Sequence, residues 1–210
     1  MKGRSHRQSR DNSMRRKTDT IIAAARERGR LRSRDLAEIG ASRTMLAYLT
    51  GKGILRRIAR GVYVLANQIS EHEAFLEIAA AVPHGVICLL SALQFHEITT
   101  QMPMETWVAI QRNSTVPRSV QSPVRIVKFS GSTFTEGIEE HHIDGLPLRV
   151  YCPAKTVVDC FKFRNRIGLD VAREALVDCL GQKKATRDEI YQYAKLCRMA
   201  QVMRPYLEMV

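Results

Sequence analysis

A short polar stretch beginning at Ser42 carries side chains suited to hydrogen bonding with DNA bases. Ser42 is a typical helix N-cap, and Arg43 and Thr44 follow it directly. Arg43 can donate two parallel hydrogen bonds to a guanine edge, and Thr44 can bond a base or a phosphate. Ala47 allows close approach to a thymine methyl group, and Tyr48 suits a position that is half core and half phosphate contact. The stretch predicts a base-reading surface; the competing interpretation is an ordinary capped helix on the surface.

Basic residues on both sides of this stretch suit the DNA backbone. Attraction to phosphates supplies affinity, and an arginine in a narrow minor groove adds recognition of DNA shape. Ser33 and Arg34 stand where a supporting helix is expected to begin, and backbone N–H groups at a helix start can hold a phosphate. The predicted contacts in this group are Arg32, Ser33, Arg34, Lys52, Arg56, Arg57 and Arg60. For each of them a solvated surface charge is the alternative.

A second candidate lies at a helix start further along the chain. Pro153 favours the first turn of a helix, and Lys155, Thr156 and Asp159 follow it at helical spacing. Lys155 or Thr156 could hold an anion there, such as a phosphate of a nucleotide or of RNA. The structural alternative, which we prefer for stability, pairs Asp159 with Lys155 or Lys162. Lys155, Thr156 and Asp159 are still the best candidates for a working surface of the C-terminal region.

Histidines and acids around residue 141 raise the question of a metal site. His141 and His142 stand beside Glu139, Glu140 and Asp144. Neighbouring residues on a strand point to opposite faces, so these side chains do not converge on one ion. The five cysteines lack C-x-x-C spacing and are predicted to be small core residues. Because the sequence also lacks a phosphate-binding glycine loop, a nucleophile elbow and an H-E-x-x-H motif, we expect no metal, no cofactor and no enzymatic activity.

The elements that must position the first candidate follow one another in the order of a winged helix-turn-helix. Caps and apolar spacing predict three short helices, a brief extended step and a hairpin. The helix that begins after Ser42 is the one that enters the major groove in such a motif. The predicted helices cover residues 18–28, 34–39 and 43–50, the extended step 30–32, and the hairpin strands 54–58 and 62–65.

The charge of the chain is concentrated in this same region. Residues 1–65 contain 17 of the 33 basic residues and 5 of the 21 acidic ones, so they carry the whole net charge of +12. A basic N-terminal part joined to a neutral remainder is typical of a nucleic-acid-binding protein. Residues 1–17 show no apolar periodicity and are predicted to be a disordered basic arm. Met14 is an alternative start site, in which case residues 1–13 lie upstream of the natural chain.

The remainder of the chain is predicted to be one α+β domain over residues 71–210. The whole protein is thus an α+β chain: an N-terminal winged helix-turn-helix over 18–66, then a domain with an antiparallel sheet and a helical C-terminal end. No apolar run is long enough to span a membrane and no secretory signal is present, so we expect a cytoplasmic protein. Helices are predicted over 71–81, 91–97, 154–166, 169–180 and 186–199, and strands over 106–111, 124–129, 138–143 and 148–151. Residues 86–90 are predicted to be either a buried strand or the start of a helix.

Several stretches of this sequence resemble the AbiEi-type antitoxins of bacterial type IV toxin–antitoxin systems. They span about residues 18–180, and their order and spacing carry the resemblance. The stretches are 60–65 (RGVYVL), 91–93 (SAL), 99–101 (TTQ), 107–110 (WVAI), 151–161 (YCPAKTVVDCF), 164–165 (RN) and 168–170 (GLD).

The resemblance implies an autorepressor that binds inverted repeats in its own promoter, with a role in phage resistance. It also implies a C-terminal domain that counters a nucleotidyltransferase-type toxin without forming a tight complex with it. Two alternatives stay open. One is a plain transcriptional regulator whose C-terminal domain binds a ligand or dimerises. The other is a nuclease or transferase with a site around His141, Asp144 and Lys155.

Overall fold

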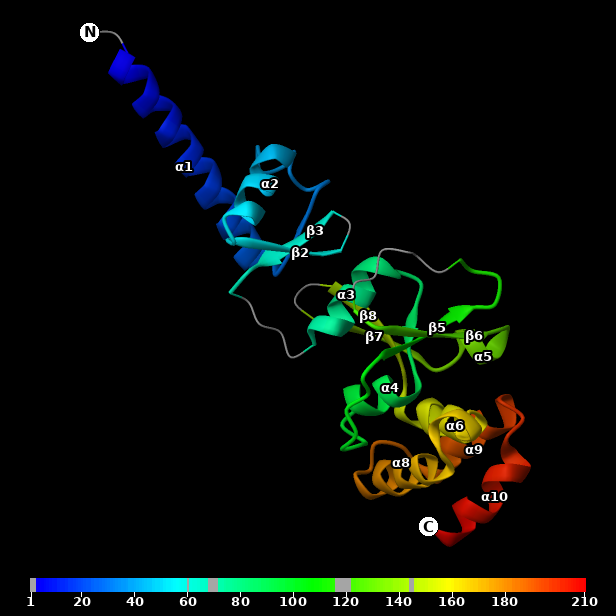
Figure 1. Ribbon diagram of the computed structural model, residues 1–210. Coiled ribbons are helices and arrows are strands. Elements are labelled where there is room, and N and C mark those ends of the chain that lie inside the picture. The colour runs from blue at the N-terminus through cyan, green and yellow to red at the C-terminus, as the bar shows by residue number, and fades with distance from the viewer. Residues whose placement is uncertain (1–2, 60, 68–71, 116–121, 144–145) are drawn as a thin grey trace. The chain divides into compact units, whose positions relative to one another are not determined.

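The computed structural model describes residues 3–59, 61–67, 72–115, 122–143 and 146–210 (Figure 1). The chain forms two compact units. The N-terminal unit comprises Met1–Ala81 together with His142–Leu146, and the C-terminal unit comprises Val82–His141 and Pro147–Val210. The predicted α+β class is confirmed, and each unit has its own sheet.

The N-terminal unit is built around a three-stranded antiparallel sheet in the order β1-β3-β2. One face of this sheet packs against α1 and α2 through a core that includes Ile21, Leu46, Leu49, Leu55 and Leu65. The elements of the unit are α1 (Gly3–Arg28), β1 (Leu31–Arg32), α2 (Arg43–Gly51), β2 (Leu55–Ala59), β3 (Val62–Leu65) and α3 (Glu73–Ala81).

The other face of the same sheet is also apolar, and this decides where the unit ends. Along β3, Val62 and Val64 face away from the core of α1 and α2, and together with Ile58 they pack against Leu76 of α3 and against Leu146. A unit ending at residue 66, as predicted, would leave these side chains in water. The unit therefore extends to Ala81 and includes the segment 142–146.

Two predictions for the first 40 residues are wrong. Residues 3–17, predicted to be a disordered arm, form the start of α1, because extending an existing helix adds a hydrogen bond for each residue fixed without a new nucleation step. Residues 34–39, predicted to be a helix, form turns instead. The Asp35 carboxylate accepts a hydrogen bond from the Arg32 N–H at 3.0 Å, a local bond that competes with helix formation, although Leu36 still points into the core.

The C-terminal unit has a five-stranded mixed sheet in the order β6-β5-β4-β8-β7. The pair β4–β5 is antiparallel, whereas β4–β8 and β5–β6 are parallel, which the predicted antiparallel sheet did not include. The strands are β4 (Val86–Ile87), β5 (Thr106–Gln111), β6 (Val124–Phe129), β7 (Ile138–Ile143) and β8 (Leu146–Tyr151).

Helices of the C-terminal unit gather on one side of this sheet, with α6 at their centre (Figure 1). Residues 154–161 of α6 are all buried, and Val157, Val158 and Phe161 join the largest core of the chain. Among the described residues no helix is long and apolar enough to cross a membrane. The helices are α4 (Leu89–Phe95), α5 (Ser132–Thr135), α6 (Pro153–Lys162), α7 (Arg164–Ile167), α8 (Leu169–Gly181), α9 (Arg187–Leu196) and α10 (Ala200–Met209).

Candidate nucleic-acid interface

The helix α2 is held in place by its cap and by two buried leucines. Ser42 has extended backbone angles, and its hydroxyl accepts a hydrogen bond from the Met45 N–H at 3.3 Å. Leu46 and Leu49 are buried at 1% and 0% exposure and fix which side of the helix faces inward. The side chains predicted to read bases therefore share the solvent-facing side of α2. These exposed residues are Arg43, Thr44, Ala47 and Tyr48.

The C-terminal end of α2 adds a cation beside this face. Lys52, the C-cap residue, is exposed, and its Nζ lies 5.8 Å from the ring centroid of Tyr48. Tyr48 is 45% exposed and is not part of the core of this unit, so of its two predicted roles only the solvent-facing one fits its position. Lys52 and the Tyr48 hydroxyl are thus placed where a phosphate flanking a base-reading helix would lie.

The hairpin β2–β3 separates its two adjacent arginines onto opposite faces of the sheet. Arg57 is exposed and lies opposite Tyr63 in the register. Arg56 lies on the α3 face, where its guanidinium forms an ion pair with Glu73. Arg56 is therefore not a free phosphate ligand, in contrast to the prediction. Arg60 lies outside the described residues.

The corner between α1 and the 33–40 turns brings together a third group of cations. The Ser33 N–H donates to the Gly61 carbonyl at 2.8 Å, so it is not available to a phosphate and this part of the prediction is wrong. Arg34 keeps a 72% exposed side chain at 3.7 Å from Asp35, and Arg32 is half-buried.

Arg30, which the sequence reasoning missed, belongs to the same corner. Its Nη1 is buried and makes no hydrogen bond within the described part of the chain. Burial and the neighbouring Arg32 lower the pKa of the Arg30 guanidinium. The recurrence of arginine at every second position, 30, 32 and 34, is the signal that could have identified it.

The second candidate group is not a surface. Lys155, Thr156 and Asp159 are each 0% exposed, so the prediction of a working surface there is wrong. The Lys155 Nζ donates to the Asp159 carboxylate at 2.5 Å, and the Thr156 hydroxyl donates to the Tyr151 carbonyl at 3.1 Å. Polar residues at the start of a helix are usually predicted to be exposed. In this unit the sheet and α9 cover these three side chains. The structural alternative is confirmed.

The environment of this ion pair is apolar and aromatic. The Lys155 Nζ lies 4.2 Å from the ring centroid of Tyr151 and 5.0 Å from that of Phe129. The second oxygen of Asp159 lies 3.8 Å from the Cys197 Sγ. Burial raises the pKa of the Asp159 carboxyl, and the Lys155 ammonium opposes that rise. The pair is therefore a structural element in which each charge depends on the other.

The remaining candidates around residue 141 do not assemble a site. The His141 Nε2 lies 3.3 Å from Glu139, and its ring packs edge-on against Phe95 at 4.8 Å between centroids. Groups of three or more histidine, cysteine or acidic side chains that could hold a metal are absent among the described residues. Asp144 lies outside the described residues. Four cysteines are buried, and burial raises the pKa of the Cys179 and Cys197 thiols to about 11, which fits the predicted core role.

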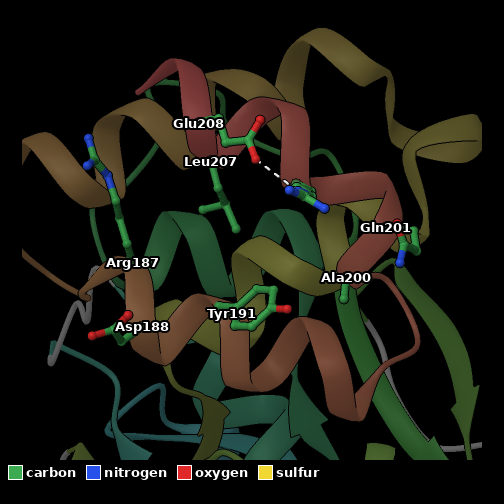
Figure 2. A pocket seen from close by; sticks show the side chains of 8 residues that line it. Arg187, Asp188, Tyr191, Ala200, Gln201, Leu207 and Glu208 are labelled. Atoms are coloured by element: carbon green, nitrogen blue, oxygen red, sulfur yellow. Dashed lines mark hydrogen bonds and ion pairs between the residues drawn. The ribbon is translucent and has the colours of Figure 1, made fainter.

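The C-terminal unit also has a pocket between α9 and α10. Its volume is about 500 Å³. Figure 2 shows the apolar side chains of Tyr191, Leu207 and Ala200 in its lining, together with charged residues such as Arg187 and Glu208. Its cations are engaged within the unit: Arg204 pairs with Glu208 at 2.9 Å, and Arg187 donates to the Val210 carbonyl.

Comparison with known proteins supports the N-terminal assignment and the fold. Residues 19–66 match the family described as transcriptional regulator, AbiEi antitoxin, so the predicted resemblance is confirmed over this segment. A solved structure, the RV2827C protein from Mycobacterium tuberculosis, is similar with a TM-score of 0.60 at 14% identity, over 85% of this chain and 71% of that one. This likeness shows a shared fold. No curated protein matches the sequence.

Proposed function

We propose that this protein is the autorepressor and antitoxin of a type IV toxin–antitoxin operon and acts in the cytoplasm. The N-terminal unit binds inverted repeats in the promoter, and the C-terminal unit counters a nucleotidyltransferase-type toxin without a tight complex. The observation that carries the proposal is the solvent-facing side of α2, where Arg43, Thr44, Ala47 and Tyr48 lie together in the segment that matches AbiEi regulators.

On DNA, α2 lies in the major groove with its N-terminal turn toward the base edges. Arg43 donates to a guanine, and Ala47 contacts a thymine methyl group. Arg57 on the hairpin and Lys52 at the end of α2 contact phosphates on either side. The half-buried Arg30 side chain adds its charge to the attraction for a phosphate at the corner before the turns, although its Nη1 is itself buried.

For the C-terminal unit we propose action by binding rather than by catalysis. The nuclease alternative needs Lys155 beside DNA, but that side chain is fully buried and paired with Asp159. The link to a toxin rests on the AbiEi resemblance of the chain.

A plain regulator with a ligand-binding domain is the second candidate function. The pocket between α9 and α10 favours it, because a volume of about 500 Å³ lies within the range typical of small-molecule sites, about 300–1,000 Å³. Co-expression with the neighbouring gene of the operon distinguishes the antitoxin from the plain regulator. Rescue of growth from a toxic neighbouring nucleotidyltransferase supports the antitoxin, and a neighbour that is harmless by itself contradicts it.

Promoter binding is tested with the full-length protein and two matched arginine variants. Arg43→Ala removes the proposed guanine contact, and Arg173→Ala removes an exposed arginine of α8 that carries the same charge. Arg43→Ala should cost about 1–3 kcal/mol on the operator and relax preference at one base position. Fluorescence anisotropy with operators substituted base by base measures this. A loss of equal size on every sequence would remove the base-reading role from Arg43.

A further inference from the structure

A second cavity of the C-terminal unit has the chemistry of an anion site. It is a cleft of about 330 Å³, and three cationic side chains line it: Arg112, Lys128 and Lys162. Two hydroxyl side chains, Ser130 and Thr133, complete its polar lining. The apolar lining is aromatic and consists of Phe129 and Phe163.

The fold brings these residues together from β5, β6, α5 and α6. The strands β5 and β6 run parallel with Gln111 paired to Phe129, and the Arg112 N–H donates to the Phe129 carbonyl at 2.8 Å. Arg112 and Ser130 are thus the first residues after the carboxyl ends of two neighbouring parallel strands. The carboxyl edge of parallel strands is where open sheets of this kind bind ligands.

The end of α6 closes the same cleft. Lys162 is the last residue of α6, and its Nζ lies 6.0 Å from the ring centroid of Phe129. Phe163, the C-cap residue, packs its ring against Phe129 at 5.5 Å between centroids. The Arg166 guanidinium lies 5.6 Å from the Phe163 ring and extends the positive charge beyond the cleft.

The charges in this cleft are uncompensated. No acidic residue lines it, and neither Arg112, Lys128 nor Lys162 forms an ion pair with another described residue. Asp159, one helical turn before Lys162, has a buried carboxylate that is already bonded to Lys155. Residues 66–210 contain equal numbers of basic and acidic residues, so three unpaired cations in one cleft stand out against a neutral unit.

We propose that this cleft binds the phosphate of a nucleotide, either free or at the end of a single-stranded RNA. Arginine and lysine donate charge-assisted hydrogen bonds to phosphate oxygens, and the Ser130 hydroxyl adds a donor of ordinary strength. The Thr133 hydroxyl donates to the Ser130 carbonyl at 2.7 Å and so holds the Ser130 backbone beside the cleft. The aromatic rings supply the apolar lining that a base or ribose needs. A cleft near the lower end of the range of small-molecule sites admits one nucleotide unit rather than a duplex.

This site is independent of the proposed operator contacts, because all of its residues belong to the C-terminal unit. The experiment uses the full-length protein and titrates it with ATP, GTP, CTP and UTP, with a 5′-phosphorylated hexaribonucleotide, and with inorganic phosphate, by isothermal calorimetry. Lys162→Gln and Thr133→Val alter the cleft. Lys195→Gln, which removes an exposed lysine of α9, is the control of equal charge.

We expect a nucleotide or the hexaribonucleotide to bind, and Lys162→Gln to weaken that binding by about tenfold or more, as expected for loss of a charge-assisted hydrogen bond. Thr133→Val should weaken it less, and Lys195→Gln should leave it unchanged. Comparing free nucleotides with the hexaribonucleotide identifies the source of the phosphate. Trp107, the single tryptophan, is buried in this unit, and its fluorescence verifies that each variant is folded.

Three results would overturn the proposal. The first is the absence of binding to every probe at millimolar concentration. The second is inorganic phosphate binding as tightly as the nucleotides, which would leave the aromatic lining without a role. The third is loss of operator binding in Lys162→Gln to the same extent as in Arg43→Ala, which would make the cleft part of a duplex-DNA surface. Intact operator binding with no nucleotide binding would reject this site and leave the proposed function standing.

Discussion

Removing the negative charge of the buried ion pair should destabilise the C-terminal unit strongly. Asp159→Asn keeps the shape of the side chain but leaves the Lys155 ammonium fully buried without a counter-charge, beside the rings of Tyr151 and Phe129. Breaking a buried pair in this way typically costs about 3–5 kcal/mol. The cost at pH 7 is limited to about 5 kcal/mol, because lysine, with an ordinary pKa of about 10.4, can instead release its proton.

Because Lys155 can release its proton, the stability of the Asp159→Asn variant should depend on pH. In Asp159→Asn the folded protein holds the Lys155 proton less tightly than the unfolded chain does. The unfolded state therefore binds more protons, and the stability of the variant rises with pH up to about 10.4. Raising the pH from 7 to 9 should recover up to about 3 kcal/mol, at about 1.4 kcal/mol for each pH unit. The wild-type protein, in which the pair is intact, should not show this recovery.

The assay is urea unfolding followed by the fluorescence of Trp107, which is 4% exposed and reports on the C-terminal unit. A loss of about 4 kcal/mol corresponds to a melting temperature lower by about 10 °C for a chain of this size. The double variant Lys155→Met with Asp159→Asn contains no buried charge and should be more stable than Asp159→Asn alone. A melting temperature within about 2 °C of wild type for Asp159→Asn, or simple additivity in the double variant, would refute the reasoning.

Three further predictions concern the interface and one buried histidine. Arg57→Ala should weaken binding to operator and unrelated DNA alike, and it should reduce the slope of log K against log salt concentration by about one unit. Titrations from about 50 to 200 mM salt measure this slope, and an unchanged slope contradicts the phosphate contact. Arg30→Ala should flatten the slope similarly without lowering the melting temperature, because its Nη1 makes no hydrogen bond among the described residues; a lower melting temperature with an unchanged slope would assign it a structural role. Burial lowers the pKa of His96, so the unfolded chain takes up a proton first on acidification. Stability should therefore fall as the pH drops below about 6.5, and His96→Gln should reduce this slope in urea unfolding.

The sequence was sufficient where local rules decide the structure. The strand 106–111 and the helix that begins after Ser42 were predicted within one residue, because β-branched runs and capping residues act over short distances. The helix predicted over 186–199 is instead interrupted after Leu196, with Arg198 at a positive φ of 59°. Neither glycine nor proline marks that break, so the sequence carried no signal for it.

The candidate sites also differ in whether neighbouring residues or residues distant in the sequence form them. The exposed face of α2 follows from helical spacing and could be predicted. The burial of Lys155 depends on Phe129 and α9, which are distant in the sequence, as well as on the nearby Tyr151. The basic cleft gathers residues between 112 and 163 from four elements, so no local pattern could have revealed it.

The segment 142–146 has a consequence for how the protein is made. Leu146 packs against Ile58, Val62 and Val64, so the core beneath the hairpin of the DNA-binding unit is closed by a residue translated some 80 positions after that hairpin. A ribosome adds about 5–20 residues each second, and this core is not complete until more than two thirds of the chain has been synthesised. Nascent chains that stop before Leu146 therefore lack a finished core in the N-terminal unit, so that unit matures only after the segment that precedes α6 has been synthesised.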